Sequence, residues 1–204
     1  MSTRNLTLLI ILGVILVLGG CVGCGTIGFQ RKAVRLDEDV KAAWGKVQSQ
    51  YQRRSDLIPN LVNVVKGAAN FEQETLTKVI EARAKATSVN IHANDLTPEK
   101  VAAFNQAQGQ LSSSLSKLLA VVENYPDLKA NQNFRDLQAQ LEGTENRIAV
   151  ARNDFNTSVQ SYNATIRQFP NNFYSGWFGF KEKGYFEAQP GSENAPKIDP
   201  NAFK

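Results

Sequence analysis

Two cysteines and a single histidine are the residue types in this 204-residue chain best suited to redox, nucleophilic or metal chemistry. The string CVGC, which ends at Cys24, has the spacing of a redox pair but lacks the strand-to-helix context that such a pair needs. His92 lies in a polar stretch without a patterned Cys, Asp or His beside it. We therefore expect no catalytic residue, no cofactor and no metal site, and a protein that is not an enzyme.

The cysteines also bear on how the amino-terminal segment is processed. The string LGGC, which ends at Cys21, is similar to a bacterial lipobox, and Arg4 would be the basic start of the corresponding signal peptide. Alternatively, residues 6–29 form one uncleaved span, because about 20 apolar residues suffice to cross a bilayer core. Both interpretations stay open. Residues 1–29 are a transmembrane anchor or a lipoprotein signal segment, and Cys21 is the candidate for lipid attachment.

Charge distribution limits the partners. The chain has 23 basic and 19 acidic side chains, and the basic ones are spread along it rather than gathered into a patch. A nucleic-acid-binding surface needs such a patch, so we expect no nucleic-acid partner. An apolar content of 42% over 204 residues fits one domain plus an anchor.

A long helical seam runs through residues 134–169 and organises the rest of the chain. Its apolar positions alternate in steps of three and four without a proline, as in a helix that packs lengthwise against others. They are Phe134, Leu137, Leu141, Ile148, Ala151, Phe155, Tyr162, Ile166 and Phe169, with Thr144 and Ser158 between them. Three earlier segments repeat the rhythm, and Gln108 takes one of their apolar positions. We predict an all-α fold: an elongated antiparallel (up-down) four-helix bundle over residues 30–169, behind an N-terminal membrane-anchoring helix.

Two turns are predicted at the far end of this bundle. Ser55 or Asp56 is suited to cap the second helix, so the first turn spans residues 53–60. Pro126 stops the third helix, and the second turn spans residues 124–133. Polar side chains of both turns would then share one tip, where they either cap helices and pair with each other or present a surface to a protein partner. The partner-surface candidates are Arg53, Arg54, Asp56, Asn60, Glu123, Asn124, Asp127, Lys129 and Asn131.

Residues 170–188 differ from the bundle because aromatic side chains dominate them: seven fall within the fourteen positions 173–186. They form a cap over the open end of the bundle, an interfacial segment at lipid-headgroup depth, or both. The membrane-interface candidates are Trp177, Phe178, Phe180, Tyr185 and Phe186. Residues 189–204, which mix Pro with Gly, Ser and Asn, predict a disordered tail.

Several strings in the chain resemble the LemA family. They are QRRSDLIPNLV at residues 52–62, EARA at 81–84, ENYPDLKAN at 123–131 and LEGTENRIA at 141–149. The resemblance implies a bacterial membrane protein with an amino-terminal hydrophobic segment and a long antiparallel helical domain. It implies no reaction, and it associates some relatives with remodelling of organelle membranes.

Two functions follow as hypotheses. The first is a membrane-anchored helical-bundle scaffold or adaptor of unknown molecular activity that presents its polar tip to a protein partner. The second is an envelope or membrane-remodelling protein that acts through its anchor and its aromatic segment. A bacterial membrane location is common to both. The side of the membrane on which the body lies stays open. By the positive-inside rule a cytoplasmic body is favoured by the basic residues that outnumber Arg4, namely Arg31, Lys32, Arg35 and Lys41, whereas a working lipobox requires a body outside the cell. Self-association through exposed heptad positions also stays open.

Overall fold

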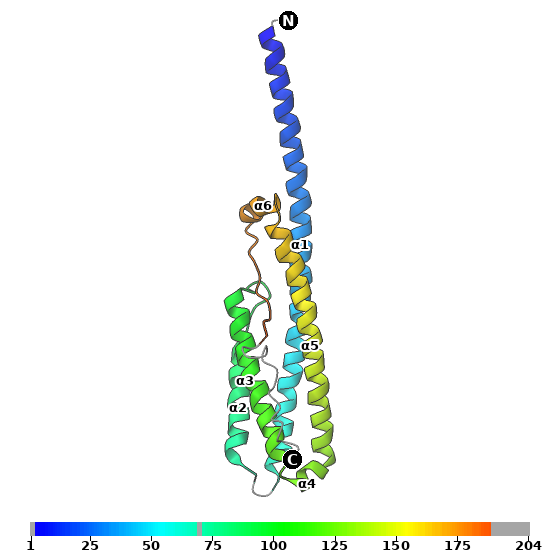
Figure 1. Cartoon of the computed structure of the whole chain (residues 1–204), viewed down its shortest axis with the longest axis vertical. Coiled ribbons are helices and arrows are strands. Elements are labelled where there is room, and N and C mark those ends of the chain that lie inside the picture. Colours follow the sequence, from blue (N-terminus) through cyan, green and yellow to red (C-terminus); the bar gives the residue numbers. More distant parts are fainter. Residues whose placement is uncertain (1–2, 69–70, 189–204) are drawn as a thin grey trace, which may run out of the picture.

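The computed structural model describes residues 3–68 and 71–188, and all the regular secondary structure in those residues is helical (Figure 1). The long helices are α1 (Thr3–Lys66), α2 (Gln73–Ser88), α3 (Pro98–Val122) and α5 (Gln132–Arg167). The short helices are α4 (Pro126–Ala130) and α6 (Asn171–Phe178). The all-α prediction is thus confirmed for the described part of the chain.

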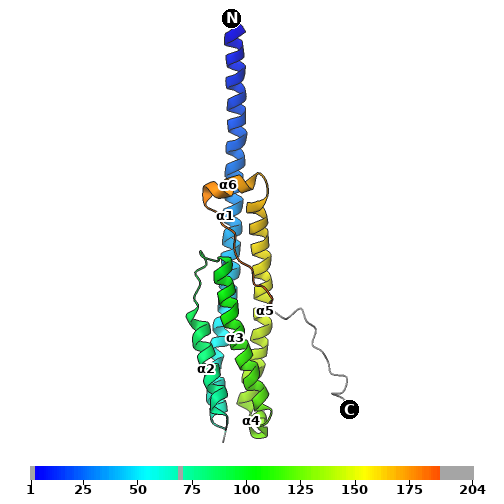
Figure 2. The ribbon, with the colours of Figure 1, turned by 60° about the vertical axis from the view of Figure 1, so that its left-hand side comes forward.

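The four long helices lie lengthwise side by side, with the chain reversing direction from each to the next (Figures 1 and 2). The most extensive packing joins α1 to α5 and α2 to α3. We call residues 29–188 the body. Its tip is the end that holds α4 and the α1–α2 connection, and its base is the end where α6 lies against α1 (Figure 2). Beyond the base, the amino-terminal part of α1 projects alone (Figure 1).

The predicted turn at residues 53–60 is wrong, because α1 continues through it to Lys66. Pro59 lies inside the helix, where its missing N–H leaves the carbonyl of Ser55, four residues earlier, without its usual donor. The Nε atom of Arg83 in α2 donates to that oxygen at 2.9 Å. A neighbouring helix therefore replaces the lost hydrogen bond, and the first reversal of the chain comes only after Lys66.

The other helix ends follow local chemistry. The hydroxyl of Thr97 accepts from the backbone N–H of Lys100 at 3.4 Å, and Pro98 occupies the first position of α3. The side-chain oxygen of Asn131 caps α5 by accepting from the backbone N–H of Asn133 at 2.9 Å. The chain leaves α6 through Gly179 at φ +74°, a left-handed conformation suited to glycine.

Two hydrophobic clusters fill the body. The cluster near the base gathers aromatic side chains around Trp44, which is fully buried, with Phe104 and Phe155 at ring-centroid distances of 5.2 and 5.4 Å. The cluster near the tip is mainly aliphatic and centres on residues such as Leu61 and Leu118. The core is therefore divided along the long axis rather than continuous.

An extended segment, the strap (residues 180–188), runs from α6 along the body (Figure 1). Asn163 and Asn156 of α5 each make two hydrogen bonds to its backbone, to Lys183 and Phe186 respectively, at 2.9–3.0 Å. The spacings match, because two helical turns rise about 10.5 Å and three extended residues span about 10 Å. Gly184 contacts α3 so closely that a Cβ would lie 2.6 Å from the Cα of Pro98. The strap is thus clamped between α5 and α3.

The structure describes the predicted anchor, residues 1–29, only in part. No helix within them meets the length and hydrophobicity that a membrane span requires. The backbone of α1 passes the predicted boundary at residue 29 without a break. The side chain of Cys21, and with it the lipid-attachment prediction, lies outside the described residues, as does the tail predicted over residues 189–204.

Candidate functional site

Among the described side chains, no cluster of three or more His, Cys, Asp or Glu is positioned to hold a metal ion. His92 is exposed on the connection between α2 and α3. Three regions of the fold carry polar features: a buried layer around Arg54, which we call the arginine layer, the tip and the base.

Arg54 lies between the two hydrophobic clusters and is only 1% exposed. Its Nη1 donates to the Ser112 hydroxyl at 2.7 Å and to Glu145 Oε2 at 3.0 Å. Its Nη2 donates to Gln108 Oε1 at 2.6 Å and to the Gln108 carbonyl oxygen at 3.3 Å. The guanidinium carbon lies 5.0 Å from the centroid of the Tyr51 ring. Four acceptors and one aromatic face thus hold the charge inside the body.

This arginine layer connects all four long helices. Arg54 belongs to α1, its acceptors to α3 and α5, and the Gln108 amide in turn donates to the Ala86 carbonyl of α2 at 3.3 Å. A helix that slid by one turn would leave these buried polar groups unpaired, so the layer fixes the register of the helices. Arg54 is therefore not part of a partner surface, and its placement at the tip is corrected.

A cavity of about 170 Å³ adjoins the arginine layer between α1, the end of α2 and α3. The Ser55 hydroxyl contributes to its wall, is buried and has no hydrogen-bond partner among the described residues. The other polar lining side chains are uncharged: Gln48, Tyr51, Gln52, Thr87, Asn90 and Gln108. This size and lining suit a few ordered water molecules.

The predicted common tip does not form as expected. Arg53, Asp56 and Asn60 are exposed along the side of α1, and Asp56 accepts from the Gln52 amide at 2.7 Å. Since α1 runs thirteen residues past Arg53, that side chain lies about 20 Å before the end of the helix. The turn after α3 does reach the tip, and its exposed polar residues are Glu123, Asn124, Asp127, Lys129 and Asn131. Lys129 pairs with Glu123, and Asn131 caps α5, which leaves Asn124 and Asp127 facing solvent.

Lys183, on the strap, makes the most buried ion pair among the described residues. Its Nζ lies 2.7 Å from Asp37 and 5.1 Å from the ring centroid of Tyr162. Burial by itself would raise the pKa of Asp37, but hydrogen bonds and charge from Lys183 and Lys41 outweigh burial and lower it. Hydrogen bonds to Asp37 and then Glu38 raise the pKa of Lys41 to about 12. This pairing ties the strap to α1 just below the base.

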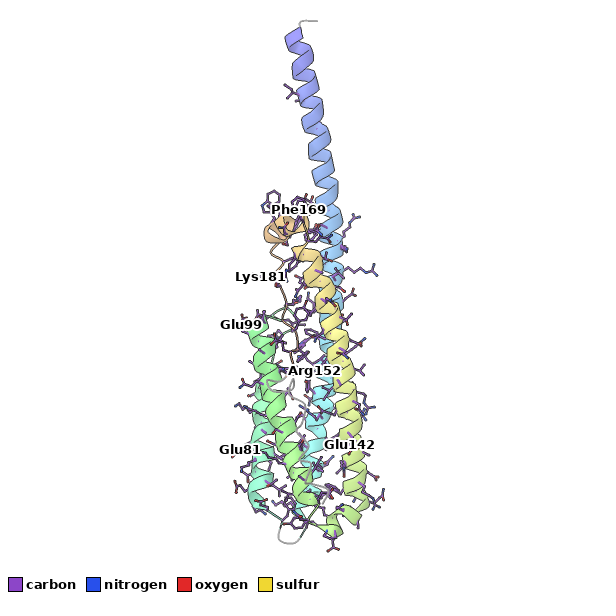
Figure 3. The ribbon with its side chains drawn as sticks, in the orientation of Figure 1. Glu81, Glu99, Glu142, Arg152, Phe169 and Lys181 are labelled. Atoms are coloured by element: carbon purple, nitrogen blue, oxygen red, sulfur yellow. The ribbon has the colours of Figure 1, made fainter. Side chains whose placement is uncertain are left out.

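Aromatic side chains crowd the base (Figure 3, where Phe169 and Lys181 are labelled). Trp177 is 83% exposed and Phe173 is 66% exposed, both on α6, and Phe169, just before α6, is 75% exposed. On the opposite face of α6, Tyr174 packs against Phe29 of α1 at a ring distance of 5.9 Å. The segment 170–188 therefore caps the body with one set of aromatic side chains and exposes another.

The membrane-interface candidates are separated by this arrangement. Trp177 and Phe178 are exposed, and Tyr185 is 39% exposed on the strap. Phe180 is half-buried against the basal cluster. Phe186 is 5% exposed and stacks on Trp44 at 6.0 Å, so its assignment to a membrane interface is wrong. The Asn156 side chain both donates to the Phe186 carbonyl and accepts from the Phe186 N–H, which holds the backbone of Phe186 with its ring in the core.

Comparison with known proteins identifies the family of the chain. The model of the LemA family matches residues 43–199. The chain belongs to the LemA family. The matched region begins within α1 and includes the arginine layer, the tip, α6 and the strap. The LemA resemblance drawn from the sequence strings is thereby confirmed.

Individual relatives of this LemA-family chain are distant. Magnetosome protein MamQ 2 of Paramagnetospirillum magneticum and magnetosome protein MamQ of Magnetospirillum gryphiswaldense are each 27% identical over 190 residues, covering 84% of this chain and 69% of each relative. Protein LemA of Metamycoplasma hominis is 25% identical over 143 residues, covering 70% of this chain and 62% of that protein.

Sequence reasoning missed the arginine layer and the strap clamps. A usable signal exists for the layer, because Gln108 and Thr144 interrupt apolar seams and both prove to be buried at the level of Arg54. The clamps of Asn156 and Asn163 have no comparable signal, since their partners are backbone atoms of a segment without periodicity.

Proposed function

We propose that this chain is a membrane-anchored helical scaffold or adaptor: an up-down four-helix bundle, tethered through the amino-terminal part of α1, that offers its tip to a protein partner. The observation that carries the proposal is the unbroken course of α1 from Thr3 to Lys66. One helix then serves as both the tether and the first helix of the body, so motion of one is transmitted to the other.

Helix lengths support this arrangement. Residues 6–28 of α1 rise about 35 Å, compared with a hydrocarbon core of about 30 Å. Residues 29–66 rise a further distance of about 57 Å, which is the distance that separates the tip from the base. The body would therefore act as a rigid spacer that holds the tip well clear of lipid headgroups.

The spacer is tested by energy transfer in the full chain reconstituted into vesicles. A donor is introduced through a non-natural amino acid either at Asn124 (tip) or at Gln168 (base), and acceptors are carried on lipid headgroups. We expect efficient transfer from the base donor and weak transfer from the tip donor. Insertion of four glycines between Gly28 and Phe29 should break α1 and raise transfer from the tip. Equal transfer from both positions in the intact chain would refute the spacer.

The adaptor role is tested at the tip itself. A photo-crosslinking amino acid at Asp127 should capture a discrete partner in cells, whereas the same group at Arg53, exposed on the side of the body, should not. The variant Asp127→Lys should lose the partner and keep its helical circular dichroism. Identical crosslinking patterns at the two positions would count against a tip-specific partner.

Membrane remodelling is the second candidate function. It is favoured by the names of two relatives, which are magnetosome proteins, and by the exposed aromatic side chains of the base. Purified full-length protein should then deform vesicles, as seen by electron cryo-microscopy, and the variant Trp177→Ser should reduce the effect. Vesicles that keep their size and shape at high protein density would leave the scaffold as the better description.

A further inference from the structure

We propose that the base is a docking surface for an anionic lipid leaflet, with an aromatic ridge that enters the interface and a basic collar that contacts the headgroups. This inference rests on the proposed membrane tether and adds the residues that meet the bilayer and the class of lipid they select. The ridge is Phe169, Phe173 and Trp177. The collar is Arg31, Lys32, Arg35 and Lys181.

The ridge is an exposed apolar surface with no role in the core. Phe173 and Trp177 are four residues apart, which places them on one side of α6, and Phe169 lies in the turn just before that helix. Each is at least 66% exposed, and the rings of Phe169 and Phe173 contact edge to face at 5.9 Å. Trp and other aromatic side chains favour the depth of the headgroups, where apolar carbons leave water and the indole N–H keeps polar partners.

The ridge is also held rigidly to α1. Phe29, only 5% exposed, contacts Tyr174, Phe178 and Phe180 at ring distances of 5.9, 6.4 and 5.9 Å. These contacts fix α6 at the level of α1 where the body ends and the apolar part of the helix begins (Figure 2). The ridge therefore needs no rearrangement to meet a bilayer that surrounds residues 6–28.

The collar has the opposite charge to an anionic leaflet. Arg31, Lys32 and Arg35 are exposed on α1, and Lys181 is exposed at the start of the strap (Figure 3). The stretch of α1 before Asp37 contains no acidic residue. The one acidic side chain at this level of the strap, Glu182, lies 3.5 Å from Arg167, a further basic residue. The net charge of the base is therefore positive.

Depth places the two features in the correct order. Along α1, the collar begins two residues after Phe29 and ends six residues after it, which corresponds to about 3–9 Å from Phe29 in the direction of the tip. The headgroup layer of each leaflet is about 5–8 Å thick. With the ridge at the edge of the hydrocarbon, the basic side chains thus fall among phosphate and carboxylate groups, where each is expected to strengthen docking about fivefold.

The two tryptophans make the proposal testable in the full chain. Trp44 is fully buried, whereas Trp177 is 83% exposed on the ridge. The protein is reconstituted into vesicles whose lipids carry bromine near the headgroup end of the acyl chains and which contain either an anionic or only a zwitterionic phospholipid. In anionic vesicles we expect bromine to quench Trp177. The variant Trp177→Phe should abolish quenching and leave the emission of Trp44.

Flotation of the same samples separates this inference from the proposed tether. Protein that floats with vesicles but shows no quenching of Trp177 keeps the tether and overturns the docking surface. Protein that does not float overturns both. Co-flotation with quenching in anionic vesicles supports both.

Charge variants test the lipid class. Neutralising Arg31, Lys32 and Arg35 to Gln should lower the ratio of embedded to free Trp177 by about 100-fold if the three contributions multiply. The matched control neutralises three exposed basic residues on the side of the body, Lys46, Lys117 and Arg147, and should change nothing. Equal quenching in zwitterionic and anionic vesicles, or equal effects of the two triple variants, would overturn the selection for anionic lipid.

Discussion

Replacement of Arg54 tests whether a buried polar layer holds the helices in register. Arg54→Ala removes a charged donor from four acceptors and leaves the Gln108 side-chain oxygen, itself in a residue only 7% exposed, without a partner. Loss of one side of a buried, hydrogen-bonded charged network costs about 3–5 kcal/mol. The ion pair with Glu145 adds little, because that carboxylate is 55% exposed and screened by water. Most of the lost free energy of unfolding therefore comes from neutral acceptors that are left without a donor.

Two further variants separate the polar contribution from packing. Arg54→Met restores most of the volume but still strands Gln108, so we expect it to cost about 1–3 kcal/mol. The double variant Arg54→Met with Gln108→Met removes the donor and its main acceptor together. It should be more stable than the sum of the two single changes predicts, since an apolar replacement of a whole buried network is often neutral.

The assay is urea unfolding of the full chain in detergent, followed by circular dichroism and by the fluorescence of Trp44. A loss of about 3 kcal/mol moves the midpoint by roughly 1–2 M urea at a typical denaturant sensitivity. The control is Arg53→Ala, one residue away and exposed, which should change the free energy of unfolding by less than about 0.5 kcal/mol. If Arg53→Ala and Arg54→Ala shift the midpoint equally, the arginine layer does not stabilise the fold and the reasoning is refuted.

Three further predictions concern the strap and its ion pair. Gly184→Ala places a Cβ 2.6 Å from the Cα of Pro98 and should lower stability by about 1–3 kcal/mol in thermal unfolding, whereas Gly45→Ala, a helical site with open space, should raise it by about 0.5–1 kcal/mol. Phe186→Ala should cost about 3–5 kcal/mol and shift the emission of the tryptophan that it covers to longer wavelength; an unchanged emission would contradict its place in the core. Because the pKa of Asp37 is lowered in the folded protein, its contribution is fully present above the pKa of the unfolded state, about 4, and is lost as pH falls through the lower folded pKa. Asp37→Asn should therefore remove one acid-dependent step from a series of unfolding curves between about pH 5 and pH 2.

The helices themselves were predictable because their pattern is local. The three-and-four spacing of residues 134–169 predicted a long helix, and α5 spans Gln132–Arg167. Thr97 and Pro98 likewise predicted the start of α3, because a hydroxyl cap followed by a proline is a local signal of a helix start. The position of the first reversal was not predictable in this way, because Pro59 and the polar residues around it look locally like a helix start.

The roles of individual polar and aromatic residues were harder to predict, for the same reason in each case. Arg53 and Arg54 are identical side chains at adjacent positions, yet one is exposed and the other is buried. Trp177 and Phe186 belong to one aromatic-rich segment, yet one faces solvent and the other enters the core. The two aromatic residues cannot be separated by composition or spacing, whereas Arg54 does continue the three-and-four spacing of Tyr51 and Ile58, a signal that its charge obscures.

The sequence by itself determined the helical class, the long seam of α5, the family and the concentration of aromatic residues after it. Those properties depend on residue types within a few turns of helix. Only the tertiary structure decided that α1 passes Pro59, that Arg54 is internal and that α6 exposes its ridge. Each of these depends on a partner far away in the chain: Arg83 for the Ser55 carbonyl, Gln108 for the guanidinium, and Phe29 for α6. A buried polar group or a broken helix bond is stable only when such a partner is present, and the fold alone brings these partners together.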